Sequence, residues 1–110
     1  MSADYFYKEM KSYMEEYLTH LHKSSAPKIV DRQYDILFFF VDFLYYKERY
    51  TGLEELTAGS MGAKFRAFFI NNTGRMLKEV EGKRVLKGFF EFIYDRHGIR
   101  SEKVMKALSK

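Results

Sequence analysis

Cationic side chains accumulate in the second half of this chain, where they could bind phosphate groups. Residues 1–60 contain 7 Lys and Arg against 10 Asp and Glu, whereas residues 61–110 contain 12 against 5. Concentrated positive charge attracts a phosphate backbone and releases its counterions, so nucleic acid is the first partner to consider. The alternative is a hydrated basic face without a partner, because small domains often carry such faces.

Five of these cations lie just before or in the first half of one expected helix, which runs from about Met76 to His97. Lys83 and Lys87 are one helical turn apart, and Arg84 lies three residues before Lys87, so a helix projects these three side chains to one side. Side chains of this kind position a protein on DNA by contacting phosphates. The expected DNA-binding residues are Arg75, Lys78, Lys83, Arg84 and Lys87, with weaker contributions from Lys28 and Arg32.

Other residue patterns that could support catalysis or metal binding are weak. His97 and Arg100 form an H-x-x-R pattern at an expected helix end, where a cation interacts favourably with the helix dipole. His20 and His22 are two residues apart, so on a helix they point away from each other and cannot share a metal ion. No Gly-rich phosphate loop follows a strand. We expect no enzymatic activity, no cofactor and no metal site.

The composition indicates one folded domain over residues 1–110. Hydrophobic residues make up 46% of the chain and aromatic residues 18%, which is too much apolar mass for a disordered protein. There is no cysteine, so disulfides and thiolate metal sites are excluded. The N-terminus lacks the apolar core of a signal peptide, and the longest apolar run, residues 36–46, is interrupted by Asp42 and too short to span a bilayer. We expect a cytoplasmic protein with no membrane role.

Apolar residues recur at spacings of three and four along most of the chain, which predicts helices almost everywhere. In the first helix this apolar face consists of Phe6, Met10, Tyr13, Tyr17 and Leu21. Ser25 is expected to cap a second helix, with Pro27 in its first turn, where a missing N–H has no cost. The Thr51–Gly52 pair is expected to end this helix.

A third helix is expected to start after Thr57, although two glycines near its start each cost about 1 kcal/mol relative to alanine. Residues 71–74, Asn-Asn-Thr-Gly, predict a turn before the fourth helix. That fourth helix is expected to stop at Gly98, and a short last helix to start at Ser101. The predicted fold is a compact all-α bundle of four main helices plus a short C-terminal helix.

Several short segments, taken in this order, resemble one known domain. They are Tyr17–Leu21, Ala26–Val30 with the following Leu37, Phe40, Val41, Phe43 and Leu44, then Leu53–Thr57, Met61 with Phe65, and Leu86–Ile93. Together they are similar to the N-terminal, SAM-like core-binding domain of tyrosine recombinases and phage integrases. The resemblance covers nearly the whole chain. It implies the topology of that domain, in which the second and fourth helices approach double-stranded DNA.

The chain also departs from this family. Gln33 stands where the family commonly has a tyrosine, and Asp31 and Asp35 flank Arg32 in a helix that is usually richer in arginine. Glu102-Lys103 replaces the usual asparagine–proline pair. The catalytic domain, which supplies the arginines, lysine, histidine and tyrosine nucleophile of a recombinase, has no counterpart in 110 residues. The resemblance therefore implies a detached DNA-binding module, a truncated relic, or the same fold put to another use, in each case without recombinase chemistry.

The alternative function is protein–protein interaction, most simply in a homodimer with no nucleic-acid role. One small core is not expected to bury all of Tyr5, Tyr7, Tyr45, Tyr46 and Tyr50. Tyrosine suits interfaces because its ring buries area while its hydroxyl stays hydrogen-bonded. The two functions are compatible, since a dimer could present two basic helices to DNA.

Overall fold

A computed structural model describes residues 2–109, and within them every regular element is a helix. The α-helices are α1 (Ala3–His22), α2 (Pro27–Asp42), α3 (Ala58–Met61), α4 (Ala63–Thr73), α5 (Glu79–His97) and α6 (Glu102–Leu108). A π-helical turn, Phe43–Lys47, extends α2, and a 3₁₀ turn, Leu53–Glu55, precedes α3. The all-α prediction is confirmed, and the third predicted helix is divided into the four-residue α3 and the longer α4.

Polar side chains fix the starts of three helices. The Ser2 hydroxyl accepts a hydrogen bond from the Tyr5 N–H at the start of α1, and Ser101 accepts one from Val104 at the start of α6. Thr57 caps α3, as its sequence position predicts, because its hydroxyl accepts the backbone N–H of Ser60. In return, the Ser60 hydroxyl accepts the backbone N–H of Thr57 at 2.7 Å. Such caps satisfy N–H groups that have no partner inside the helix.

The second helix differs from its prediction at both ends. Its N-cap is Ala26 rather than Ser25, because the Ser25 backbone N–H donates to the Leu21 carbonyl and closes α1. Helical structure ends at Lys47, before the expected Thr51–Gly52 stop. There the turn widens into π-helical hydrogen bonding, and the chain reverses at Arg49, whose φ is 56°.

The third predicted helix is interrupted at Gly62, which separates α3 from α4. A Cβ atom at this position would lie 3.0 Å from the Ala58 carbonyl oxygen, so the sharp bend needs a residue without a side chain. The turn predicted at residues 71–74 is shorter than expected, since α4 continues to Thr73 and only Gly74 adopts the left-handed conformation. Side-chain bonds from Asn72 and Thr73 to carbonyls four residues earlier support this last turn.

The fourth predicted helix, α5, begins at Glu79 rather than near Met76. The preceding segment is extended because Leu77 is buried in the core and Arg32 holds the Met76 carbonyl with a hydrogen bond of 2.9 Å. At the other end, Gly98 is left-handed and terminates α5, as predicted. The basic residues before α5 therefore lie on an extended connection and not on the helix.

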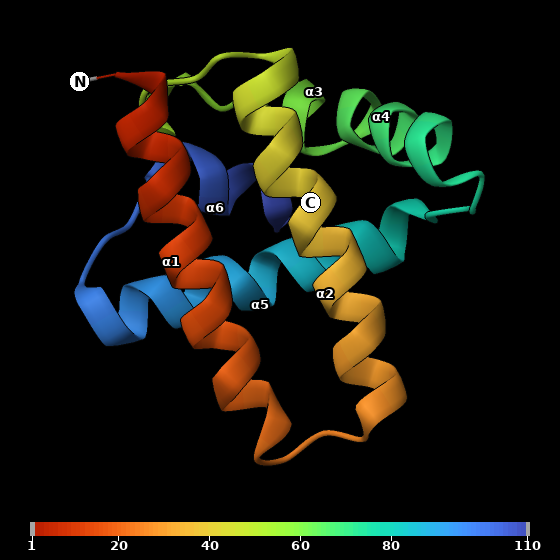
Figure 1. Cartoon of the computed structure of the whole chain (residues 1–110). Coiled ribbons are helices and arrows are strands. Elements are labelled where there is room, and N and C mark those ends of the chain that lie inside the picture. Colours follow the sequence, from red (N-terminus) through yellow and green to blue (C-terminus); the bar gives the residue numbers. More distant parts are fainter. Residues whose placement is uncertain (1, 110) are drawn as a thin grey trace.

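Helices α1 and α2 form an antiparallel hairpin, and α5 crosses behind both of them, with α6 packed further back (Figure 1). The short helix α4 lies beside the end of α2 and reaches the start of α5 through the loop around Gly74. The radius of gyration is 13.0 Å, close to the value of about 13 Å for a compact domain of this length.

Phenylalanine dominates the core at the point where these helices cross. The Phe40 ring from α2 contacts Phe65 of α4 edge-on at 5.1 Å and Phe90 of α5 at 6.1 Å between centroids. Such edge-to-face pairs add about 0.5–1.5 kcal/mol beyond the area they bury. Phe43, Phe69 and Phe89 are also fully buried. This aromatic centre fixes α5 against the α1–α2 hairpin.

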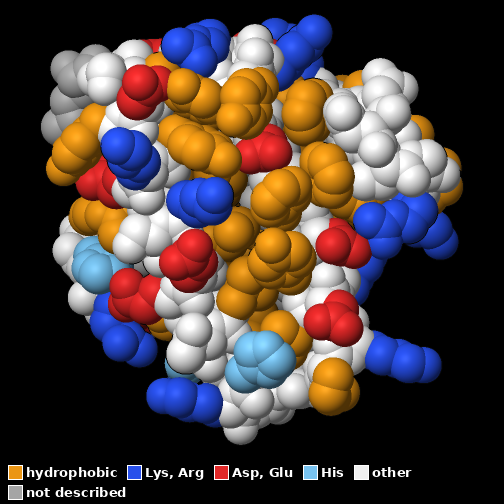
Figure 2. Space-filling model, viewed as in Figure 1, with side chains coloured by type: hydrophobic (Ala, Val, Ile, Leu, Met, Phe, Trp, Pro, Cys, Tyr) orange, Lys and Arg blue, Asp and Glu red, His pale blue; other side chains and the backbone are white. Residues whose placement is uncertain are grey.

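The near face of the molecule, over α1 and α2, carries a continuous group of hydrophobic side chains among scattered charges (Figure 2). Some large apolar residues are strongly exposed, such as Tyr46 at 63% and Val80 at 74%. Between residues 2 and 109, no helix has the length and apolar character needed to cross a membrane.

Candidate nucleic-acid interface

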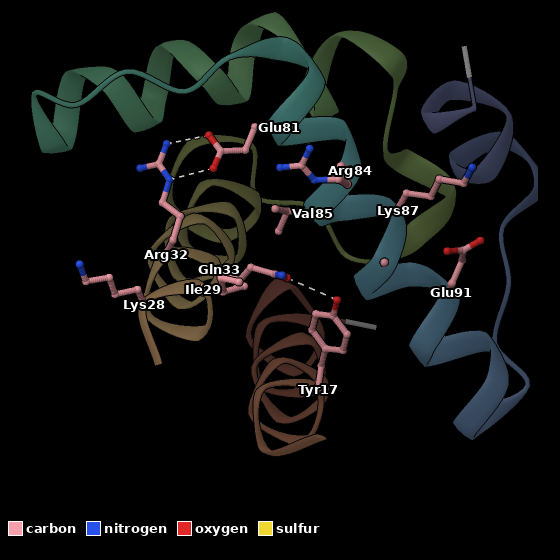
Figure 3. A pocket seen from close by; sticks show the side chains of 11 residues that line it. Tyr17, Lys28, Ile29, Arg32, Gln33, Glu81, Arg84, Val85, Lys87 and Glu91 are labelled. Carbon is pink, nitrogen blue, oxygen red and sulfur yellow. Dashed lines mark hydrogen bonds and ion pairs between the residues drawn. The ribbon is translucent and has the colours of Figure 1, made fainter. Parts of the chain in front are cut away.

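A groove of about 710 Å³ lies between α1, α2 and α5 and brings together cations that are far apart in the sequence (Figure 3). We call it the basic groove; its lining residues are Tyr17, Lys28, Ile29, Arg32, Gln33, Glu81, Arg84, Val85, Lys87, Gly88 and Glu91. The lining includes four cations and two carboxylates. Four of the seven predicted DNA-binding residues, Lys28, Arg32, Arg84 and Lys87, therefore share one site.

Helical spacing explains why these residues converge. Lys28 and Arg32 are four residues apart on α2, so both point to the same side of that helix. On α5, Arg84 and Lys87 are three apart and face the same groove. The two helices thus line the groove from two sides, with the Lys28 and Lys87 side chains directed away from each other and the exposed Ile29 on the α2 side (Figure 3).

Arg32 is committed to holding α5 against α2. Its Nε and Nη2 donate to the two carboxylate oxygens of Glu81 at 3.0 and 2.8 Å, and Nη2 also donates to the Met76 carbonyl. These hydrogen bonds lower the pKa of Glu81 below the ordinary glutamate value and raise the pKa of Arg32. A two-pronged pair of this kind is geometrically specific and strong for a partly exposed ion pair. Arg32 therefore positions the groove, and its charge is already compensated.

The wall of the groove on the α1 side is formed by Tyr17, which approaches α5 closely. Its hydroxyl donates to the Gln33 amide oxygen at 3.4 Å, and burial raises the pKa of this hydroxyl. A Cβ atom at residue 88 would lie 2.8 Å from the same hydroxyl oxygen. Gly88 is thus required by the close contact between α1 and α5, and the contact keeps Tyr17 in the groove wall.

Two other predicted DNA-binding residues form ion pairs with carboxylates outside the groove. Lys83 does not join Arg84 and Lys87, because its ammonium forms an ion pair with Glu79 at 3.1 Å one turn earlier on α5. Arg75 forms an ion pair with Asp35 at 2.9 Å. Lys83, which the helical spacing predicts on the same side as Arg84 and Lys87, is not among the residues that line the groove.

Apart from Arg32, the other predicted DNA-binding cations are not held in ion pairs of this kind among the described residues. Within residues 2–109, Lys28, Arg84 and Lys87 form no ion pair and no side-chain hydrogen bond with the protein. Lys78 is exposed at the N-cap of α5, outside the groove lining. Since Glu81 is hydrogen-bonded to Arg32, the positive potential of the groove comes from Lys28, Arg84 and Lys87. It is opposed in part by Glu91 and by Glu81, which also interacts electrostatically with Arg84.

The other sequence candidates are accounted for by local contacts. His97 is the last residue of α5, and its Nε2 lies 3.0 Å from a Glu16 carboxylate oxygen, while Arg100 pairs with Glu102 at 2.8 Å. His20 lies against the Phe92 ring. In the described part of the chain, no three His, Asp or Glu side chains gather as a metal site requires.

Sequence patterns did not identify the uncharged parts of the groove. Tyr17 is expected only as part of an apolar helical face, and Gln33 only as a departure from a family pattern. Only the tertiary contact between Tyr17 and Gln33 places these two residues in the groove. On α5, by contrast, the spacing of four and three between Arg84, Gly88 and Glu91 indicates that they share one face of the helix.

The chain was compared with family models, with curated proteins and with solved structures, and none of the three comparisons found a match.

Proposed function

We propose that this chain is a non-catalytic DNA-binding module that contacts the phosphate backbone of duplex DNA along the basic groove. The observation that carries the proposal is that three cations without ion-pair partners, Lys28 from α2 and Arg84 and Lys87 from α5, line one open groove. Cations that lack a carboxylate partner are available to replace the counterions of a phosphate backbone.

The proposal agrees with the resemblance to the core-binding domain of tyrosine recombinases. That resemblance implies DNA contact through the second and fourth predicted helices, which correspond to α2 and α5. The antiparallel α1–α2 hairpin crossed by α5 supports a topology of that kind. Backbone contacts from three cations specify no sequence, so we expect non-specific affinity in the micromolar range or weaker.

The test is a fluorescence-anisotropy titration with a short DNA duplex at low and moderate salt. The groove variant combines Lys28→Glu, Arg84→Glu and Lys87→Glu, and it is expected to lose binding while its helical circular-dichroism signal is retained. The matched control combines Lys47→Glu, Lys64→Glu and Lys106→Glu, three exposed lysines outside the groove that change the net charge by the same amount.

Retained binding in the control together with lost binding in the groove variant supports the groove as the interface. Equal losses in the two variants would mean that net charge alone drives binding, which refutes a groove-specific role. No binding by the unsubstituted chain at low salt would refute the proposed function altogether.

A further inference from the structure

Rings that contact one another lie partly or largely exposed on the α1–α2 face, away from the basic groove. Tyr7 of α1 stacks on Tyr45 at 4.5 Å between centroids, and Tyr46 contacts both rings at 6.0 and 4.7 Å. On α2, Tyr34 stacks on Phe38 at 5.9 Å. We call these five residues the aromatic face.

The two groups of rings belong to one surface. Tyr34, Phe38 and Asp42 succeed one another at intervals of four residues, which places them along one side of α2. Asp42 in turn accepts a hydrogen bond from the Tyr7 hydroxyl, which links this side of α2 to α1. Figure 2 shows hydrophobic side chains gathered over these two helices on the near face. Tyr46 remains 63% exposed and Tyr34 46% exposed, so a large part of the rings meets water.

Two of the four tyrosine hydroxyls of this face are hydrogen-bonded to carboxylates within the chain. Tyr7 donates to Asp42 at 3.1 Å, and Tyr45 donates to Asp4. Burial and the Asp42 carboxylate together raise the pKa of Tyr7 to about 12, so this ring stays neutral. A partner can therefore cover the Tyr7 and Tyr45 rings without supplying hydrogen-bond acceptors for their hydroxyls.

The charges that touch the rings are balanced in sign. Lys11 lies over the Tyr7 ring at 5.6 Å and Arg49 over the Tyr45 ring at 4.5 Å, while Asp4 and Asp42 accept from the hydroxyls of the same two tyrosines. A surface with two cations and two carboxylates around an apolar centre complements itself, because a two-fold rotation can place each cation opposite a carboxylate. A strongly acidic or strongly basic partner would instead be opposed by half of these charges.

We propose that a second copy of this chain docks on the aromatic face in a two-fold symmetric dimer. A stable interface of standard size buries about 800 Å² per protomer, which is about one eighth of the 6425 Å² accessible surface of this chain. The aromatic face has the composition that such interfaces favour, with tyrosine and phenylalanine at the centre and charges at the edge. The basic grooves, which lie on α2 and α5, stay outside this contact.

Analytical ultracentrifugation over a range of protein concentrations tests the proposal. The chain is expected to change reversibly from monomer to twice the monomer mass. A Tyr34→Glu, Tyr46→Glu variant is expected to stay monomeric, because it puts four carboxylates into the dimer contact. The matched control is Tyr94→Glu on α5, a tyrosine of similar exposure at 44% that should leave the dimer intact. If the glutamate variant does not fold, Tyr34→Ser with Tyr46→Ser provides the same comparison without added charge.

A chain that remains monomeric at every concentration overturns the proposal. A dimer that persists when Tyr34 and Tyr46 are replaced, by glutamate or by serine, also overturns it. The experiment contains no DNA, so its outcome is independent of the proposed function. The groove variant of Lys28, Arg84 and Lys87 is expected to dimerise as the unsubstituted chain does.

Discussion

Replacing Lys87 with alanine should change the salt dependence of DNA binding, whereas replacing Lys83 should not. The two lysines lie one turn apart on the same helix and have the same charge. They differ in their surroundings, since Lys83 is paired with Glu79 at 3.1 Å and Lys87 lines the basic groove without an ion pair in the described chain. Comparing the two variants therefore tests whether ion pairing in the folded protein decides which cations bind phosphate.

The expected size of the effect follows from the number of cations that line the groove and have no ion-pair partner. Three phosphate contacts, from Lys28, Arg84 and Lys87, give a slope of log affinity against log salt of about −2.7, which weakens binding about 40-fold between 50 and 200 mM salt. Removing Lys87 reduces the slope to about −1.8 and the loss to about 12-fold. If all seven predicted cations bound phosphate, the slope would be about −6.3 and the loss about 6,000-fold.

The assay is a series of anisotropy titrations with one duplex at several salt concentrations. We expect the slope of the Lys83→Ala variant to equal that of the unsubstituted chain and the slope of Lys87→Ala to be shallower by about one unit. Equal changes in the two variants would refute the reasoning from ion pairing, and a starting slope near −6 would show that the paired cations also bind.

Three further predictions concern the groove and the aromatic face. Arg32→Ala should reduce the free energy of unfolding by about 1–2 kcal/mol in a denaturant titration, because its bonds to Glu81 are lost, while the salt slope stays unchanged. Because the folded-state pKa of Glu81 is lowered, its contribution is present above the ordinary value of 4.5 and lost as pH falls through the folded-state pKa, so this difference should shrink in acid. Gly88→Ala should stabilise the chain by about 1 kcal/mol only when combined with Tyr17→Phe, since the added Cβ otherwise meets the Tyr17 hydroxyl at 2.8 Å; equal effects in both backgrounds would contradict this contact. In an ultraviolet pH titration of tyrosine ionisation, Tyr7→Phe should remove one group that ionises near pH 12, and an unchanged late phase would place that group elsewhere.

The helical class and several helix ends follow from local sequence. Thr57, Ser101 and Gly98 act as predicted because a cap or a stop depends on hydrogen bonds and backbone angles within about one turn. The unexpected boundaries have tertiary causes. The delayed start of α5 depends on Leu77 entering the core and on Arg32 holding the Met76 carbonyl, neither of which is encoded by neighbouring residues.

The sequence also determined where positive charge accumulates, but not which charges are compensated. Arg32 and Glu81 are 49 residues apart and Arg75 and Asp35 are 40 apart, so their pairing exists only after the helices have packed. Packing likewise placed Tyr17 and Gln33 in the groove with Lys28, Arg84 and Lys87. The periodicity that predicts a helix acts over three or four residues, whereas an ion pair depends on distance in space, and for this reason only the tertiary structure separated the paired cations from those left to bind a partner.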